Sequence, residues 1–175
     1  MGTLGESGLS EKLWGSKTAA VIGKTKIPVM VVPYDYEWKA PKNILLASNH
    51  FEKEPALLDG LFEMALKLNA NVQVAVITDD DFDHADVVLE HSRQTPEYEK
   101  FLKTKYNADS LTATHLSGKG FEETLQKYIH EKDIDIVAMI TYQNKRSFWD
   151  RLFHPSETKR MSYHTKIPLL AIPAK

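Results

Sequence analysis

The chain has 175 residues and a formal net charge of −2, with 42% hydrophobic and 26% charged residues, which is typical of a globular protein. The small net charge gives no electrostatic reason to expect nucleic acid or an anionic membrane as a partner, and no apolar run is long enough to cross a membrane. The absence of cysteine excludes disulfides, thiolate metal sites and a cysteine nucleophile. We therefore expect a cytoplasmic protein with one complete domain and room for a remnant of another.

The N-terminal stretch, residues 2–16, is rich in glycine and serine. Ser16 is a typical N-cap for a short helix over residues 17–22. The apolar, largely β-branched run of residues 27–32 predicts a buried strand. Residues 34–41 show no periodicity, and we interpret them as a linker.

The rest of the chain alternates strand-like and helix-like segments. Buried strands are predicted at residues 43–48, 72–78, 111–116, 134–140 and 167–172. Helices are predicted from Pro55 onward, around residues 96–105, and over residues 121–131 and 148–166, with residues 79–86 as an acidic connection. This alternation implies a parallel sheet with helical crossovers. The sequence therefore predicts a five-stranded, doubly wound α/β domain, in which ligands bind at the carboxyl ends of the strands.

One phrase occurs twice in the chain. Residues 25–33 read TKIPVMVVP and residues 165–173 read TKIPLLAIP, an offset of 140 residues (165 − 25). A period of about 140 residues matches the size of a whole domain. A full domain's length precedes the second copy, whereas only 24 residues (25 − 1) precede the first. We therefore predict that the chain contains the end of one unit followed by one complete unit.

The glycine-rich start has a defined spacing. Gly2, Gly5, Gly15 and Ser16 fit the pattern Gly-x2-Gly-x9-Gly-Ser of the nucleotide-binding universal stress proteins. On this pattern and the doubled phrase, residues 1–36 resemble the C-terminal end of a domain of that family, and residues 42–175 resemble a complete one. The whole is similar to the tandem universal stress proteins. The resemblance implies a partial domain with its linker at residues 1–36 and a complete domain at 37–175.

The resemblance also implies a fold for both parts. The complete domain is expected to be Rossmann-like, of the adenine nucleotide alpha hydrolase-like type. Residues 1–36 are expected to add a C-terminal helix–strand piece of a second such unit.

The same four residues are the candidate nucleotide-binding site. Glycines let the backbone approach phosphate oxygens, and Ser16 with the following helix N-terminus supplies N–H donors. The resemblance implies that such a motif binds ATP with magnesium, while the first two strands of a domain hold adenine and ribose. Because the first copy lacks those strands, the site is incomplete unless another chain or a preceding segment completes it. The alternative is an ordinary N-cap after a flexible start.

The complete domain departs from the motif. Ile140 and Pro155 occupy positions where the family has glycine, and Pro155 also lacks an N–H donor. Its degenerate cleft is predicted to be lined by Asn49, Thr141, Ser147 and Ser156. We therefore expect no cofactor there and weak or no ATP binding, with a different small ligand as a further alternative.

Other site chemistry has little support in the sequence. Asp79, Asp81 and Asp83, followed by Glu90, mimic a calcium loop, but His84 stands where that loop needs glycine, so we favour a solvated acidic loop. The seven histidines include no pair at a helical spacing of four, so no zinc site is predicted. We interpret His50 as a surface residue and His115 as a hydrogen-bonded strand residue. No Gly-x-Ser-x-Gly elbow is present, so no catalytic residue is predicted.

The hypothesis that joins these observations is a universal stress protein-like stress-response protein that acts by binding and association and is not an enzyme. The alternative is an ATP-binding protein or weak ATPase that uses the N-terminal motif. The resemblance implies association through last strands. We therefore predict antiparallel pairing of Val29–Val32 with Leu169–Ile172, within one chain or between two, and a homodimer without nucleic-acid or membrane partners.

Overall fold

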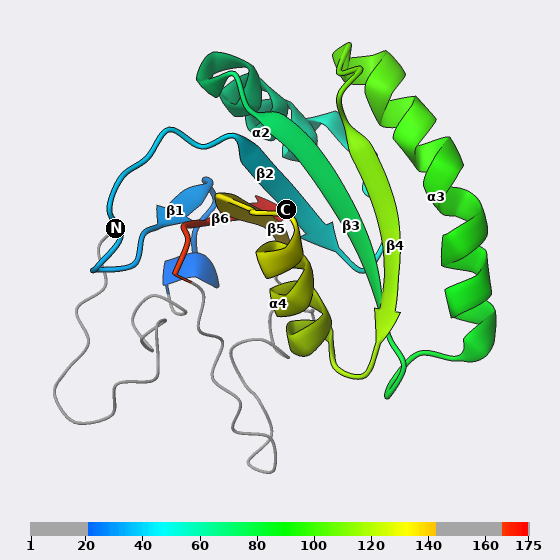
Figure 1. The fold of residues 1–175 in the computed structure, drawn as a ribbon. Coiled ribbons are helices and arrows are strands. Elements are labelled where there is room, and N and C mark those ends of the chain that lie inside the picture. Colours follow the sequence, from blue (N-terminus) through cyan, green and yellow to red (C-terminus); the bar gives the residue numbers. More distant parts are fainter. Residues whose placement is uncertain (1–20, 143–165, 175) are drawn as a thin grey trace, which may run out of the picture. The chain divides into compact units, whose positions relative to one another are not determined.

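The computed structural model describes residues 21–142 and 166–174 (Figure 1). It is a mixed α/β fold whose six-stranded, mostly parallel sheet has the order β1-β6-β5-β2-β3-β4. The strands are β1 (Val29–Val31), β2 (Asn43–Ser48), β3 (Asn71–Asp79), β4 (Thr112–Gly118), β5 (Ile136–Tyr142) and β6 (Leu169–Ala174). The helices are α2 (Pro55–Leu68), α3 (Ala85–Tyr106) and α4 (Phe121–Glu131). The predicted α/β class is confirmed, and β1 is the additional strand.

The described residues fall into two compact units. Residues 40–137 form one, and the described residues before and after them form the other. No helix in the described part of the chain is long and apolar enough to span a membrane.

The unit of residues 40–137 is built on three parallel strands. β2 pairs with β3 from Asn43 opposite Asn71 to Ser48 opposite Val76. β3 pairs with β4 up to Asp79 opposite Gly118. Every residue of β2 after Asn43 is buried, so both faces of this strand are covered, as in doubly wound sheets. The carboxyl ends of the three strands meet at one edge, where the site described below lies.

Helix α2 shows why the sequence pattern was informative. It begins at Pro55, which lacks an N–H that the first helical turn would leave unpaired, and it ends at Asn69 in the left-handed conformation with φ 52°. Its buried residues share one face at helical spacing: Leu57, Leu58, Leu61, Phe62 and Ala65. Burying each of the large side chains contributes roughly 1.5–3 kcal/mol, so this face holds the helix in place.

Helix α3 corrects a prediction. The sequence predicted a helix around residues 96–105 after an acidic connection, but the helix begins at Ala85 and contains Pro96 in its interior. Its buried residues are Thr95, Tyr98 and Leu102, which lie from the middle of the helix onward. Before Thr95 the helix has only half-buried residues, so it gave a weak periodic signal. In Figure 1, α3 runs alongside β4.

In the other unit, β1 pairs with β6 in antiparallel orientation. Val29 lies opposite Ala171, Met30 opposite Leu170, and Val31 opposite Leu169. Val31 and Leu169 are fully buried. Val29–Val31 thus pairs with Leu169–Ala171 inside one chain, in the antiparallel orientation that the resemblance implied.

Candidate functional site at the carboxyl ends of the strands

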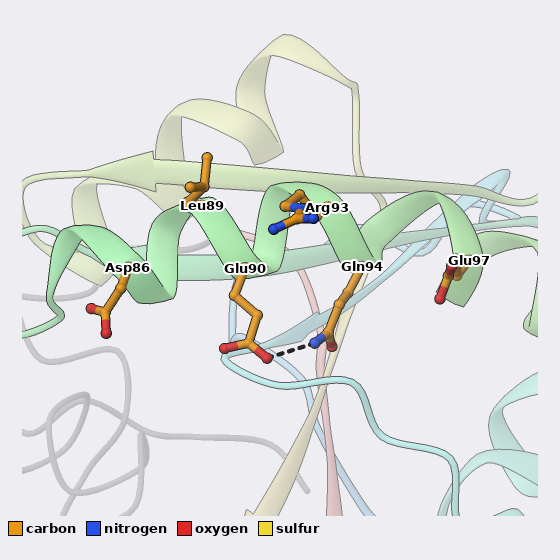
Figure 2. A pocket seen from close by; sticks show the side chains of 6 residues that line it. All are labelled: Asp86, Leu89, Glu90, Arg93, Gln94 and Glu97. Carbon is orange, nitrogen blue, oxygen red and sulfur yellow. Dashed lines mark hydrogen bonds between the residues drawn. The ribbon is translucent and has the colours of Figure 1, made fainter.

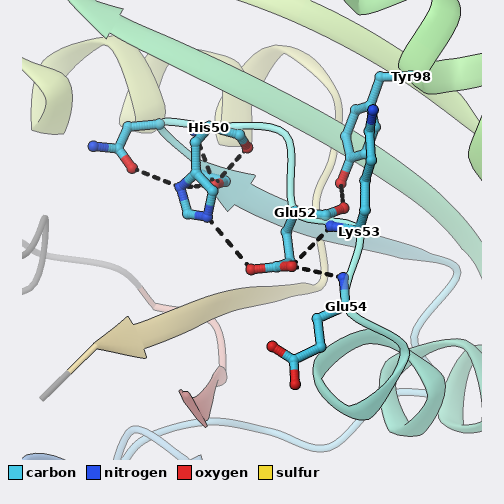
Figure 3. Close-up of polar contacts among 7 residues, drawn as sticks. His50, Glu52, Lys53, Glu54 and Tyr98 are labelled. Carbon is cyan, nitrogen blue, oxygen red and sulfur yellow. Dashed lines mark hydrogen bonds and ion pairs between the residues drawn. The ribbon is translucent and has the colours of Figure 1, made fainter. Parts of the chain in front are cut away.

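The loop after β2 is folded around its own polar side chains (Figure 3). Ser48 Oγ accepts a hydrogen bond from the His50 N–H (3.1 Å) and donates one to the His50 carbonyl (2.9 Å). Asn49, predicted to line the cleft, is exposed, and its Oδ1 lies 3.0 Å from His50 Nδ1. The half-buried His50 also places its Nε2 3.5 Å from Glu52 Oε2, so it is an organised part of this loop.

Glu52 occupies the approach to the N-terminus of α2. Its Oε1 accepts the backbone N–H groups of Lys53 and Glu54, both at 2.7 Å, and only 9% of the residue is exposed. Tyr98, on α3, donates its hydroxyl to the Glu52 carbonyl at 2.6 Å, and burial raises the pKa of this phenol. A helix N-terminus attracts anions, and the Glu52 carboxylate is held by the two N–H groups that directly precede α2.

Asp79 places a carboxylate directly on the N-terminus of α4. This residue ends β3, is 4% exposed, and accepts the N–H of Gly120 (3.2 Å) with Oδ1 and that of Phe121 (3.2 Å) with Oδ2. Gly120 has φ +82°, a conformation that favours glycine and that aims these N–H groups at the carboxylate. The N-terminus of α4 is therefore occupied by an internal carboxylate.

The acidic stretch after β3 is partly ordered by the backbone. Asp83 Oδ2 accepts the Asp79 N–H at 2.8 Å, and Asp79 Oδ1 accepts the Asp81 N–H at 3.1 Å. The prediction of a wholly solvated loop is thus wrong for Asp79, because its carboxylate is buried on backbone donors. Within the described ranges, no group of three or more His, Cys, Asp or Glu side chains is arranged to hold a metal ion.

A cluster of hydroxyl and imidazole groups joins β3, β4 and α3. Thr78 Oγ1 lies 3.0 Å from His91 Nδ1 and 2.7 Å from His115 Nε2. Ser92 Oγ lies 2.8 Å from His115 Nδ1. Burial lowers the pKa of both imidazoles below the ordinary value of 6.5. His115 is thus a hydrogen-bonded strand residue, as predicted, but its pairing with His91 was not predicted.

A shallow hollow lies along the N-terminal half of α3 (Figure 2). Its described lining is Asp86, Leu89, Glu90, Arg93, Gln94 and Glu97. Gln94 Nε2 donates to Glu90 Oε1 at 2.7 Å, as the dashed line shows. This lining contains three carboxylates and one guanidinium, so the hollow does not favour an anionic ligand.

Most of the site residues predicted from the sequence lie outside the described residues: Gly2, Gly5, Gly15, Ser16, Ser147 and Ser156. Thr141 is described and buried at the end of β5, where its Oγ1 lies 3.5 Å from the Ile172 carbonyl oxygen. Asn49 and Thr141 belong to different compact units.

Comparison with known proteins gives a fold relationship. No protein-family model and no curated protein matches the sequence. A universal stress protein family member from Burkholderia pseudomallei is matched over 79% of this chain and 100% of its own, with 17% identity and a TM-score of 0.51. A universal stress protein from Archaeoglobus fulgidus DSM 4304 is matched over 89% of this chain, with 12% identity and a TM-score of 0.53.

A protein of unknown function from Pseudomonas aeruginosa PAO1 is matched over 99% of this chain, with 10% identity and a TM-score of 0.61. The chain spans 52% of the length of the Archaeoglobus protein and 61% of the Pseudomonas protein. At such identities the likeness concerns architecture, and together with the strand order it shows that this chain has a universal stress protein-like fold.

Proposed function

We propose that this chain is a universal stress protein-like stress-response protein that acts in the cytoplasm by binding and association, and that its complete domain binds ATP poorly. The observation that carries the proposal is the position of two carboxylates: Asp79 accepts the first N–H groups of α4, and Glu52 accepts the N–H groups of Lys53 and Glu54 just before α2. These helices begin at the carboxyl edge of the sheet, where nucleotide phosphates bind in doubly wound folds.

The energetic argument concerns like charges. A phosphate that approaches α4 meets the Asp79 carboxylate on the first N–H groups of that helix, and one that approaches α2 meets the Glu52 carboxylate just before it. Two unit charges about 4 Å apart repel by about 1 kcal/mol in water and about 4 kcal/mol at an effective dielectric constant of about 20. The first turns of α3 and α4 add Asp86, Glu122 and Glu123. These carboxylates therefore disfavour a polyphosphate at the starts of the described helices.

Association is supported by the register of β1 and β6. In the repeated phrase, Met30 is the counterpart of Leu170, and these two residues lie opposite each other. Val29 lies opposite Ala171, the counterpart of Val31, and Val31 lies opposite Leu169, the counterpart of Val29. A rotation of 180° that carries each residue of β1 onto its counterpart in β6 therefore preserves the pairing. This is local two-fold symmetry, the symmetry of an isologous interface.

This symmetry fits a tandem protein in which last strands of two related units meet. The chain's coverage of about half to three-fifths of two longer structural neighbours supports the same interpretation. Our proposal therefore includes the partial unit at residues 1–36, the complete unit at 37–175, and homodimer formation by the full chain.

Titration calorimetry of Mg·ATP into the full chain tests this function. We expect no binding heat up to about 1 mM nucleotide, the concentration at which a dissociation constant corresponds to about −4 kcal/mol. The rival function is ATP binding by Gly2, Gly5, Gly15 and Ser16. Binding heat that Gly15→Val abolishes, and that the matched change Gly8→Val outside the motif retains, would establish the rival and refute our proposal.

A further inference from the structure

In the cluster of Thr78, His91, Ser92 and His115, one hydroxyl group lies between two imidazole nitrogens. Thr78 is fully buried, and its hydroxyl contacts one nitrogen from each of two imidazoles. A hydroxyl carries one hydrogen to donate, and an imidazole nitrogen accepts it only when that nitrogen is unprotonated. The Thr78 hydrogen is therefore satisfied only while His91 or His115 remains neutral.

Protonation of both histidines removes that acceptor. The Thr78 hydroxyl hydrogen would then face two N–H groups in a buried position, and an unsatisfied buried donor is costly. The two imidazolium rings, whose centroids are 5.7 Å apart, would also repel each other. Ser92 is exposed, so its hydroxyl can rotate to suit His115 and adds no such restriction.

The cluster lies where the N-terminal half of α3 meets β3 and β4. Before Thr95, residues of α3 are at most half-buried, Val87, Val88 and His91 among them, whereas the fully buried Thr95, Tyr98 and Leu102 lie from the middle of the helix onward. Hydrogen bonds join the N-terminal half to the sheet through His91, which contacts Thr78 on β3, and Ser92, which contacts His115 on β4. We propose that this cluster is an acid-sensitive latch, which releases the N-terminal half of α3 from β3 and β4 when both histidines become protonated.

The charges around the cluster set the direction of its response. Burial is the main cause that lowers the pKa of His91, His50 lowers it further, and Asp83 and Glu90 oppose the shift. Burial likewise lowers the pKa of His115, His91 adds to this effect, and Asp80 opposes it. The net direction is downward for both groups.

Because the released form has ordinary histidines, it takes up protons first as the pH falls through 6.5. The stability that the latch contributes is therefore fully present above that value and is lost progressively below it. This inference stands on the geometry of the cluster and is independent of the proposed function.

Amide hydrogen exchange of the full chain at about pH 7.5 and about pH 5.5, corrected for the intrinsic effect of pH, tests the latch. We expect the protection of residues 89–94 to fall by up to about tenfold per histidine relative to residues 98–106, because one pH unit below 6.5 an ordinary histidine of the released form is about ten times more often protonated than neutral. An equal change in the two segments would overturn the proposal.

A double variant provides the specific test. In His91→Asn with His115→Gln, the amide groups are placed to keep the contacts with Thr78 but do not titrate, so we expect the protection of residues 89–94 to become independent of pH. His130→Asn removes an exposed histidine of α4 and should respond as the wild type does. A double variant that still loses protection in acid would refute the latch. If it does not fold, imidazole NMR of the wild type decides: two steps below the ordinary value support the latch, and one shared ordinary pKa refutes it.

Discussion

Replacing Asp79 with alanine should lower the free energy of unfolding by about 3 kcal/mol. The carboxylate is buried and accepts the N–H groups of Asp81, Gly120 and Phe121. Hydrogen bonds to charged groups contribute about 1.5–3 kcal/mol each, and their contributions to one carboxylate are not additive. Alanine leaves the first N–H groups of α4 without this acceptor and removes a negative charge from the helix N-terminus. Urea unfolding followed by circular dichroism measures the loss.

Asp109→Ala is the matched control, because Asp109 is an exposed aspartate in the turn before β4. Its removal should change the free energy of unfolding by no more than about 0.5 kcal/mol. Asp79→Asn should fall between the two, since the amide oxygen accepts hydrogen bonds but carries no charge. Equal losses for Asp79→Ala and Asp109→Ala would show that the Asp79 carboxylate does not hold the start of α4.

Val31→Asp should detach β1 from β6. Val31 is fully buried opposite Leu169, and an unpaired carboxylate in an apolar site costs several kcal/mol. We expect the amide protection of residues 29–31 and of residues 169–171 to fall together, because each strand supplies hydrogen-bond partners for the other. Hydrogen exchange with mass spectrometry reports both segments in one experiment.

The neighbouring residue supplies the control. Val32 is half-buried, and successive side chains of a strand point to opposite faces, so Val32→Asp places the charge on the other face of the strand. Its effect on protection should be small. If Val31→Asp leaves β6 fully protected, the pairing of the two last strands does not stabilise this unit.

The sequence predicted the exact bounds of some helices and strands, and only the type of others. The predicted strand at residues 43–48 and helix at 121–131 match β2 and α4, and the helix at Pro55 begins where α2 does. Continuous apolar runs and apolar residues at helical spacing carry strong signals, because burial on both faces or on one face leaves a pattern. The last two strands begin two residues later than predicted, a common uncertainty at element ends.

Helix α3 shows where the pattern fails. No residue from 85 to 94 is fully buried, so their helical state leaves only a weak apolar period in the sequence. Proline is most common in the first turn of a helix, so Pro96 favoured the prediction that the helix begins near that residue. In the structure Pro96 lies inside the helix, where it has no N–H to donate four residues back. Adjacent helical turns and the buried Thr95, Tyr98 and Leu102 hold this helix despite that loss.

The candidate site was the least predictable part. Asn49 was expected because a family motif places a residue there, whereas Glu52 and Asp79 act through backbone N–H groups that no sequence motif specifies. A signal was available for Glu52, since an acidic residue just before a proline-started helix complements the helix dipole. His91 and His115 are far apart in sequence. Only the neighbouring positions of β3, β4 and α3 bring them to one hydroxyl.

The central claim is that the last strands of two related units pair about a local two-fold axis within one chain. A disulfide tests it directly, because the chain has no cysteine of its own. Residues directly opposite in antiparallel strands have Cα atoms about 4.5–5.5 Å apart, within disulfide range, whereas diagonal neighbours are about 7–8 Å apart. Met30 and Leu170 are opposite, and Val29 and Leu169 are diagonal.

The measurement is non-reducing electrophoresis with intact mass after mild oxidation of two double variants. We predict that Met30→Cys with Leu170→Cys gives a monomer that lacks two hydrogens, and that Val29→Cys with Leu169→Cys keeps free thiols. Equal cross-linking of both variants, or a Met30–Leu170 cross-link formed only between two chains, would contradict the account.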